Sequence, residues 1–556
     1  MCTDVQLTSR TYRVPRFDWG SRCGEVTVAC QETWPGDAFA AYWRQPEAPW
    51  RTLSLARRHR MLCLAASSHH AASLEAALAR SGVGLDAAVL EAAAVVGDLA
   101  ACKRLKAQGC PVSRLSLRAA AFSGHQAVVE YIMANLDPVK EPENWRWDHP
   151  CTDAAVYAAA GGHAAVLEWA AARRRGGVVK GDCFAACLMA AAHNGRGELL
   201  ERLLLQRGWG GGRLARAMRA WLRKRDTYCT SLLELAAQHC PAATLRRLHA
   251  HWVPRGRVDW VSRFSPAWLV ARAAVSPTPD WEEKAAFLLG QVDPGALTAP
   301  AASTREAQYR EMTEDQEAED KSYDIGVAVE QDVAGWGAVT VPEFAARLGC
   351  LAGLAAHGVT IRANWRRELA EVLIRAGNVA ALRELLSIWD SWVADSILQH
   401  SALQRGAVAS YMALFELLRE RRGHPGRFTM EHAMAAAQHS PYSGPCLRYL
   451  AELEGELLEP GMHGTGGTWD GVFAEAARRG ADVAVLRVLR ERRGAALDLE
   501  AVAAGGSVEA VEWAAGELRA AGQAATLTPD QLVAVATGGN LIVADWAVKH
   551  GLAQQA

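Results

Sequence analysis

The stretch that decides the fold runs from Ala158 to Trp169 and reads AAAGGHAAVLEW. Near copies of it return at 120–131 (AAFSGHQAVVEY), 502–513 (VAAGGSVEAVEW) and 535–546 (VATGGNLIVADW). In each copy a run of small residues ends at a glycine, and an apolar pair, an acid and an aromatic residue follow at fixed distances. Self-similarity of this kind is typical of repeat architectures, in which each repeat is one supersecondary unit. The sequence therefore predicts a repeated unit.

The unit has the pattern of two short helices joined by a tight turn. A glycine at the end of the first helix suits the left-handed residue that closes a helix. In several copies the next residue is Asp, Asn or Ser, and these are good N-caps for a second helix. Helical spacing places the apolar pair of the second helix on one face and directs the acid toward solvent. The marker glycines are Gly97, Gly124, Gly162, Gly195, Gly377, Gly480, Gly506 and Gly539.

The spacing of these glycines indicates the kind of repeat. Successive intervals of 27, 38 and 33 residues follow Gly97, and intervals of 26 and 33 residues follow Gly480. The nominal period near 33 is the ankyrin period. The pattern Gly-His-x-x-Val-Val/Leu-Glu resembles the second-helix half of an ankyrin repeat, whereas the Thr-Pro-Leu-His signature of the first helix is absent from every copy. We therefore expect an all-α fold, a divergent ankyrin-like helical repeat solenoid in which stacked units bury one another's apolar faces.

Three Ala-rich stretches carry a second resemblance. They are 54–66 (SLARRHRMLCLAA), 89–94 (VLEAAA) and 107–111 (AQGCP). They are similar to an Ala-rich ankyrin-repeat family of unicellular green algae, and the resemblance covers most of residues 50–210 and 475–556. Some members of that family carry an F-box ahead of the repeats, but residues 1–50 show no Leu-Pro-rich F-box. The resemblance implies a protein-interaction module and transfers no catalytic residue.

Composition and charge exclude several classes of protein. Half of the 556 residues are hydrophobic, 22% are charged, and the formal net charge is −1. The chain is too apolar to be mainly disordered, and it lacks the basic character of a nucleic-acid-binding protein. It is also longer than one compact core usually supports. We expect several domains or one elongated array, present as a monomer and without nucleic acid as its partner.

Cysteines and targeting signals bear on the compartment. The 13 cysteines form no dense disulfide framework, and the opening MCTDVQ is not a secretory signal. The best apolar stretch, 85–101, is broken by charged residues and is too short to span a membrane. We expect reduced thiols, no membrane partner and an intracellular location, cytoplasmic in the first place and nuclear as the alternative.

Four regions follow one another along the chain. Residues 1–50 are aromatic, contain several prolines and lack a period, which predicts an irregular N-terminal arm or cap. Residues 51–255 and 346–556 are predicted to be two ankyrin-like repeat blocks. Residues 256–345 diverge from the pattern and contain an acidic loop, 305–332, that we expect to be disordered. The sequence leaves open whether the blocks form one superhelix or two arrays.

One predicted inter-repeat loop holds the first candidate for a partner-binding site. Trp145, Arg146 and Trp147 lie there, within ENWRWDHP. Loops along one edge of an ankyrin array tend to bind partners, and Trp and Arg are enriched in binding hot spots. Local packing of the two indoles is the alternative.

A basic segment, 213–225, holds the second candidate. Arg216 and Arg219 share one helical face, and Arg223 lies one turn further on. Three interpretations stay open. The face is solvated, it binds an acidic partner or an RNA backbone, or it holds the acidic stretch 306–320 of the same chain through salt-sensitive contacts.

Cysteine and histidine pairs do not have the spacing of a metal site. Cys183 and Cys187 stand one turn apart on an apolar helix, which is typical of core thiols. His239, Cys240, His249 and His251 fall in one degenerate repeat, and we interpret them as polar residues near helix ends, with a ligand set as the alternative. We predict no metal site and no cofactor.

Catalytic motifs are also missing from the sequence. The glycine-rich stretches 208–212 and 464–467 lack the Lys-Ser or Lys-Thr that a phosphate-binding loop requires. No nucleophile elbow, HExxH motif or kinase signature is found. The sequence therefore predicts a non-enzymatic scaffold that binds a partner protein of unknown identity through its repeat surface. The alternative is a substrate-recognition subunit of a ubiquitin ligase, by analogy with the F-box relatives.

Overall fold

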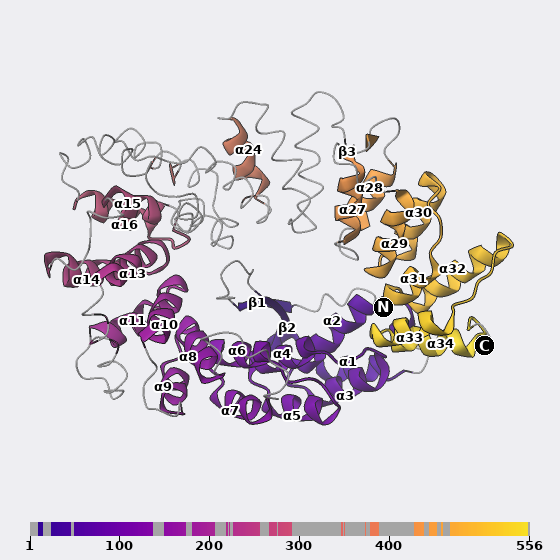
Figure 1. Cartoon of the computed structure of the whole chain (residues 1–556), viewed down its shortest axis with the longest axis horizontal. Coiled ribbons are helices and arrows are strands. Elements are labelled where there is room, and N and C mark those ends of the chain that lie inside the picture. Colours follow the sequence, from indigo (N-terminus) through magenta and orange to yellow (C-terminus); the bar gives the residue numbers. More distant parts are fainter. Residues whose placement is uncertain are drawn as a thin grey trace, which may run out of the picture. The chain divides into compact units, whose positions relative to one another are not determined.

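The structure of the chain is a computed structural model in which helices predominate and strands are few (Figure 1). The prediction of a mainly helical protein is confirmed. Among the described residues, no helix is both long and apolar enough to cross a lipid bilayer. The structure describes residues 9–14, 24–45, 49–136, 150–173, 181–205, 226–255, 266–274, 276–291, 378–387, 428–438, 444–452, 458–459 and 468–553, with a few single residues between these ranges.

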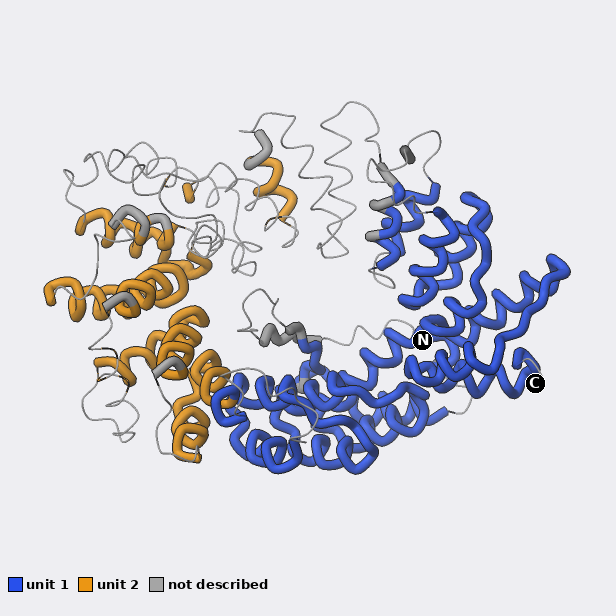
Figure 2. Tube along the Cα trace, viewed as in Figure 1, with its two compact units in different colours: residues 1–153, 422–556 blue, residues 154–421 orange. Residues whose placement is uncertain are grey.

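The chain divides into two compact units, which Figure 2 colours separately. Unit 1 comprises residues 1–153 and 422–556, and unit 2 comprises residues 154–421. Unit 1 therefore joins the beginning of the sequence to its end. The predicted acidic loop at 305–332 lies outside the described residues, as does most of the region 256–345.

The first part of unit 1 consists of helix pairs that pack on one another in sequence order. α2, α4 and α6 are in contact in that order, each also packs against the helix that follows it, and α5 packs against α7. The elements are β1 Ser9–Val14, β2 Gly24–Ala29, η1 Gln31–Thr33, α1 Gly36–Trp43, η2 Pro49–Arg51, α2 Leu55–Ala66, α3 Ala71–Arg80, α4 Ala87–Val96, α5 Leu99–Ala107, α6 Arg114–Phe122 and α7 Gln126–Asn135.

The second part of unit 1 repeats this arrangement. α27, α29, α31 and α33 are in contact in that order, and so are α28, α30, α32 and α34. The elements are β3 Phe428–Thr429, α27 Met430–Gln438, α28 Gly444–Glu452, β4 Leu458–Glu459, α29 Trp469–Arg478, α30 Val483–Arg493, α31 Leu499–Gly505, α32 Val508–Ala520, α33 Pro529–Thr537 and α34 Leu541–Lys549.

Unit 2 is built from the same kind of pair. α10, α13 and α15 are in contact in that order, and α14 packs against both α11 and α16. The elements are α8 Pro150–Gly161, which begins in the last residues of unit 1, α9 Ala164–Arg173, α10 Gly181–His193, α11 Gly197–Leu204, α13 Asp226–His239, α14 Ala242–Trp252, η3 Val253–Arg255, α15 Pro266–Ala274, α16 Trp281–Leu289 and α24 Val379–Ser387.

Alanine fills the contact between successive first helices. The runs at 92–94, 119–121, 158–160 and 190–192 are at most 1% exposed. Small side chains let two helix backbones approach closely, and close packing leaves little room for a larger residue. The high alanine content of the sequence is thus concentrated where helices stack.

The left-handed glycine is present in most described pairs, whereas the predicted N-cap bond after it forms at Asp98 and Ser507 but not at Asp482 or Asn540. Gly97 closes α4 in the left-handed conformation, with φ of 81°. Directly after it, Asp98 starts α5, and its carboxylate accepts a hydrogen bond from the Ala101 amide at 2.8 Å. In the weaker copy at 64–80, His69 takes the place of the glycine and adopts a φ of 55°. The turn conformation is therefore kept even where glycine is replaced.

One marker glycine does not behave as predicted. Gly506 has a φ of −76°, so it is not left-handed, and α31 already ends at Gly505. A Cβ on Gly505 would collide with the carbonyl oxygen of Arg478. Glycine is required there because two backbones approach closely, which is a different use of the residue from a left-handed turn.

Part of residues 1–50, predicted to be an irregular arm or cap, forms regular elements that pack on the first helix pairs. β1 and β2 form an antiparallel pair in the register Ser9↔Ala29 to Val14↔Gly24, and β2 packs against α2 and α4. The three consecutive β-branched residues of GEVTVA, Val26, Thr27 and Val28, favour a strand. α1 packs on α3, and the Trp34 indole donates to Ser73 Oγ at 3.1 Å.

Candidate functional site

The six residues predicted to bind a partner lie outside the described residues. Trp145, Arg146 and Trp147 fall in 137–149, and Arg216, Arg219 and Arg223 fall in 206–225, where only three single residues are described. Two of these three, Met218 and Leu222, are buried. The partner-binding role of the six residues stays a prediction.

The histidines and cysteine of the degenerate repeat are not assembled into a ligand set. The His239 ring lies 4.5 Å from the ring of His193, measured between centroids, and the Cys240 thiol donates to a backbone carbonyl. His249 packs edge-on against Phe287. In the part of the chain that the structure describes, no three His, Cys, Asp or Glu side chains are placed to hold a metal ion.

Cys183 and Cys187 lie inside α10 and are 3% and 0% exposed. A hydrogen bond with Cys183, together with burial, raises the pKa of the Cys187 thiol well above its ordinary value. The thiol is therefore protonated at neutral pH and poorly suited to bind a metal or act as a nucleophile.

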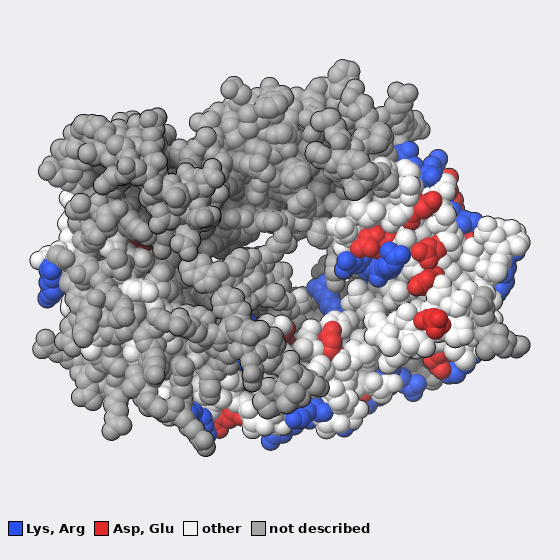
Figure 3. All heavy atoms as spheres, in the orientation of Figure 1, with Lys and Arg blue, Asp and Glu red and all other residues white. Residues whose placement is uncertain are grey.

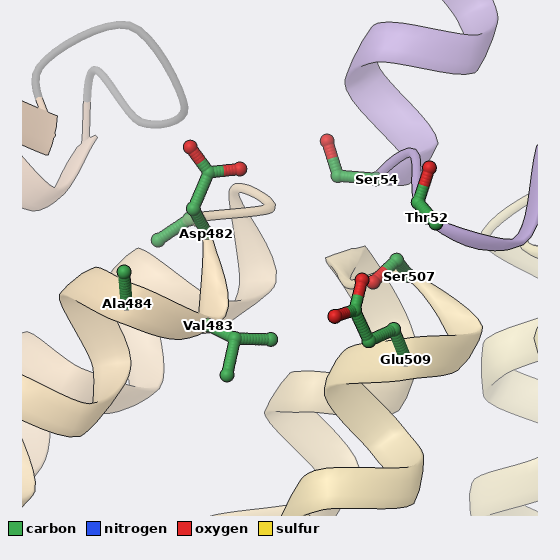
Figure 4. A pocket seen from close by; sticks show the side chains of 8 residues that line it. Thr52, Ser54, Asp482, Val483, Ala484, Ser507 and Glu509 are labelled. Atoms are coloured by element: carbon green, nitrogen blue, oxygen red, sulfur yellow. The ribbon is translucent and has the colours of Figure 1, made fainter. Parts of the chain in front are cut away.

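A cavity of about 210 Å³ in unit 1 lies where three helices begin (Figure 4). The helices are α2, α30 and α32, which are 12, 11 and 13 residues long. Their N-cap residues, Ser54, Asp482 and Ser507, all line the cavity. The remaining lining residues are Thr52, Ala481, Val483, Ala484 and Glu509.

The helix starts around this cavity keep part of their hydrogen-bonding capacity. The first amides of a helix have no partner within the helix, and an N-cap side chain normally satisfies one of them. The Ser507 hydroxyl does so, because it accepts from the Ala510 amide at 3.1 Å. The side chains of Ser54 and Asp482 make no capping bond. The first turns of α2 and α30 therefore lack a side-chain cap, although the Asp482 carbonyl accepts a hydrogen bond from the Val485 amide at 2.9 Å.

Ser54 is itself unsatisfied. The residue is only 5% exposed, and its Oγ makes no hydrogen bond within the described residues. A buried hydroxyl without a partner is unfavourable and is uncommon in native structures. The Oγ lies against Gly480 and is closed off from solvent, so the unpaired hydroxyl is a local cost of the packing at this turn.

Charged groups of both signs surround the cavity. Two guanidinium nitrogens of Arg57 lie 2.9 Å from the two carboxylate oxygens of Asp482. This two-point pairing offsets the Asp482 charge. Glu509 is exposed, and no ion pair to it is formed within the described residues. The cavity thus offers amide and hydroxyl donors together with one carboxylate that has no described basic partner.

A buried arginine next to the cavity joins the two parts of unit 1. Arg58 is fully buried, and its Nη1 donates to the carbonyl of Ser81 at 2.6 Å while its Nη2 donates to Asn540 Oδ1. The Asn540 amide nitrogen in turn donates to the Ala503 carbonyl at 2.7 Å. Burial lowers the pKa of Arg58 to about 10, so the guanidinium stays charged at neutral pH. No motif in the sequence points to this arginine.

Exposed apolar side chains gather on the last described helix pair. Among described residues, the large hydrophobic side chains that are exposed are Leu289, Val533, Leu541 and Val548, and the last three belong to α33 and α34. Val533 stands six residues before Gly539. At the same position other pairs hold charged residues (Glu91, Arg118 and Glu500) as well as apolar ones (Val156, Met189 and Ala474), so the sequence gives no signal that Val533 is exposed.

Comparison with known proteins does not identify a function for the cavity, the buried arginine or the exposed apolar side chains. The chain matches no protein-family model, and no curated protein is significantly similar to it. Its function is therefore inferred from its own residues.

Proposed function

We propose that the chain is a non-enzymatic, ankyrin-like solenoid that binds a partner protein through its repeat surface. The observation that carries this proposal is a shared register, in which the same position has the same structural role from pair to pair. A left-handed glycine closes the first helix in pairs of both units. These glycines are Gly97, Gly124, Gly162, Gly195, Gly480 and Gly539.

The residue after this glycine supports the stacking of pairs. Arg196 Nε donates to the Ala160 carbonyl at 2.9 Å, and Asn540 Nδ2 donates to the Ala503 carbonyl at 2.7 Å. In both cases the acceptor lies near the end of the first helix of the preceding pair. Arrays linked in this way present extended surfaces, and their common use is protein binding.

The charge distribution favours a protein partner over a nucleic acid. Figure 3 shows basic and acidic side chains side by side on the face of unit 1 that carries α29–α32. There Arg478 lies near Glu475 and Asp498, and Arg490 lies 3.5 Å from Glu517. A nucleic-acid surface would instead show a basic patch or stripe.

The test is capture of partners by the full-length chain with cross-linking mass spectrometry. We expect a protein whose cross-links map to the repeat surface, and we expect Trp145→Ala with Trp147→Ala to weaken its binding about tenfold, the usual size for interface hot spots. Trp169→Ala is the matched control, because it removes a half-buried indole from a helix outside that loop. Equal loss in both variants, or cross-links only within the chain, would contradict the proposal.

The same capture experiment distinguishes the general scaffold from the alternative, a substrate-recognition subunit of a ubiquitin ligase. Reproducible recovery of ligase scaffold components with the chain would support a substrate-recognition subunit. Their repeated absence, with another partner present, would reject that alternative and leave the general scaffold function in place.

A further inference from the structure

We propose that Cys63, on α2, is a modification site at which hydrogen peroxide oxidises the thiol to a sulfenic acid. Its sulfur lies beside the His59 ring, and the Asp86 carboxylate at the start of α4 holds that ring from the other side. The site belongs to unit 1, and its chemistry does not depend on the scaffold function.

The three side chains form a line of polar contacts from the thiol to the carboxylate. Cys63 Sγ lies 3.8 Å from His59 Nδ1, and His59 Nε2 lies 2.9 and 3.0 Å from the two carboxylate oxygens of Asp86. The first contact follows from helical spacing, because residues four apart share one face of α2. The thiol and the carboxylate contact different nitrogens of the ring, so the three groups do not converge on one point as metal ligands do.

The imidazole between the two groups is protonated at neutral pH. The hydrogen bond with Asp86 is the main reason why the pKa of His59 is raised to about 10. A protonated imidazole has two N–H donors. Because the carboxylate accepts from Nε2, the proton on Nδ1 faces the sulfur of Cys63. A cation beside a cysteine stabilises the thiolate, which is the nucleophilic form.

Cys63 also differs from the other buried cysteines in its access to solvent. It is 8% exposed, whereas the other cysteines described as buried are at most 3% exposed. Burial raises the pKa of the Cys102 and Cys110 thiols to about 12, so both stay protonated at neutral pH. The His59 side chain next to Cys63 is 28% exposed. An opening of this size restricts the site to small reagents, and hydrogen peroxide is among the smallest oxidants of thiols.

The reaction is a two-electron oxidation of the sulfur. The Cys63 thiolate attacks one oxygen of hydrogen peroxide, so that an S–O bond forms while the O–O bond breaks. The other oxygen leaves as hydroxide and takes up the proton that the thiol released, which gives water. The sulfur becomes a sulfenic acid, and the peroxide is reduced.

The experiment measures oxidation rates in the full-length chain with hydrogen peroxide at pH 7. Dimedone traps the sulfenic acid, and peptide mass spectrometry quantifies it at each cysteine. Cys30 is the internal control, because it is more exposed than Cys63 but its thiol donates to the Glu32 carboxylate at 3.1 Å. A carboxylate repels a thiolate, so we expect Cys63 to react about tenfold faster than Cys30. A rate at Cys63 equal to or below that at Cys30 would overturn the proposal.

His59→Gln tests the role of the ring. It removes the cation beside the sulfur and should slow trapping at Cys63 about tenfold, without changing the rate at Cys30. Loss of packing alone would expose the sulfur further and speed the reaction, so the direction of the change separates the two causes. His550→Gln, at an exposed position after α34, is the matched control and should leave both rates unchanged. Trapping at Cys63 that is as fast or faster in His59→Gln would refute the role of the ring.

Asp86→Asn tests the role of the carboxylate. Asparagine is as good an N-cap as aspartate, so α4 keeps its first hydrogen bonds. Without the carboxylate, His59 returns to an ordinary pKa near 6.5 and is mostly neutral at pH 7, so trapping at Cys63 should slow about fourfold. At about pH 5.5 that imidazole is protonated again, and the rate should approach that of the unchanged chain. A deficit of the same size at both pH values would contradict this role of Asp86.

Discussion

α4 and α33 hold the same place in their helix pairs but differ in burial. Ala92 and Ala534 both stand five residues before the glycine that follows the helix. Ala92 is completely buried, whereas Ala534 is exposed. α4 packs against the first helices of two neighbouring pairs, α2 and α6. Within the described residues, α33 packs extensively against the first helix of one neighbouring pair only, α31. Burial of a position in this fold is therefore set by the number of neighbouring pairs as well as by the residue.

The largest loss of stability is expected for the contact between Arg58 on α2 and Asn540 at the start of α34, which joins the first and second parts of unit 1. Arg58→Ala leaves the buried oxygens of Asn540 and Ser81 without their donor, so we expect a loss of about 3 kcal/mol in the free energy of unfolding. Urea denaturation of the full-length chain measures it. Arg80→Ala removes an exposed arginine from the end of α3 and should change little. An equal loss of unfolding free energy in the two variants would show that the buried hydrogen bonds of Arg58 do not stabilise the fold.

The next largest loss of stability is expected on substitution of the glycines that close α4 and follow α33. Gly97 and Gly539 have φ of 81° and 91°, so alanine strains the backbone at both. A Cβ on Gly97 also collides with the His125 ring, whereas on Gly539 it meets only Gly84, at 3.5 Å. We expect a loss of about 2–3 kcal/mol for Gly97→Ala and about 1 kcal/mol for Gly539→Ala. The shift in denaturation midpoint of each variant checks the order, and the reverse order would contradict it.

Substitution of Ala92 and Ala534 is expected to change the free energy of unfolding by a smaller amount. Ala92→Leu adds volume to a closed contact and should cost about 1–3 kcal/mol. Ala534→Leu adds the same atoms at an exposed position and should stay within about 0.5 kcal/mol of the unchanged chain. Thermal unfolding followed by circular dichroism compares them. A large loss in Ala534→Leu would mean that α33 is covered in solution.

The smallest effect concerns pH and a contact between neighbouring pairs. A hydrogen bond with Asp86, the N-cap of α4, raises the pKa of His59 on α2 from 6.5 to about 10. Because the folded chain binds this proton more tightly, the stabilisation is complete below pH 6.5 and is lost as the pH rises through 10. Asp86 is half-exposed, so the contribution is expected to be below about 1 kcal/mol.

His59→Gln is the variant that isolates this contribution. The stability difference between the unchanged chain and His59→Gln should shrink on going from pH 6 toward pH 10, as measured by urea denaturation at each pH. A difference that stays constant over this range would rule out the ion pair.

Local features of the fold were predictable from the sequence. The alanine runs before each glycine indicated close helix packing, and those at 92–94 and 158–160 are buried. The left-handed turn was predicted correctly at Gly97 and wrongly at Gly506. A glycine can adopt a left-handed turn, or it can allow two backbones to approach closely. The same Gly-containing sequence pattern occurs in both cases, so the sequence does not distinguish them.

The cavity and the buried arginine could not be predicted in this way. Arg57 meets Asp482 across 425 residues, and Arg58 meets Asn540 across 482. No pattern within a repeat specifies which distant repeat lies beside it, because every pair has a similar apolar face. Trp145 and Arg216, which the sequence predicts to bind a partner, both lie outside the described residues, so that role stays a prediction.

The contact between Arg58 and Asn540 also has a consequence in time. The ribosome adds about 5–20 residues each second, so about 25–100 seconds separate the synthesis of these two residues. Throughout this interval the guanidinium lacks the acceptor that it has in the finished fold. Pairings over such sequence distances also form slowly. Unit 1 therefore completes its folding only after unit 2 has been synthesised, although its first helices leave the ribosome before all others.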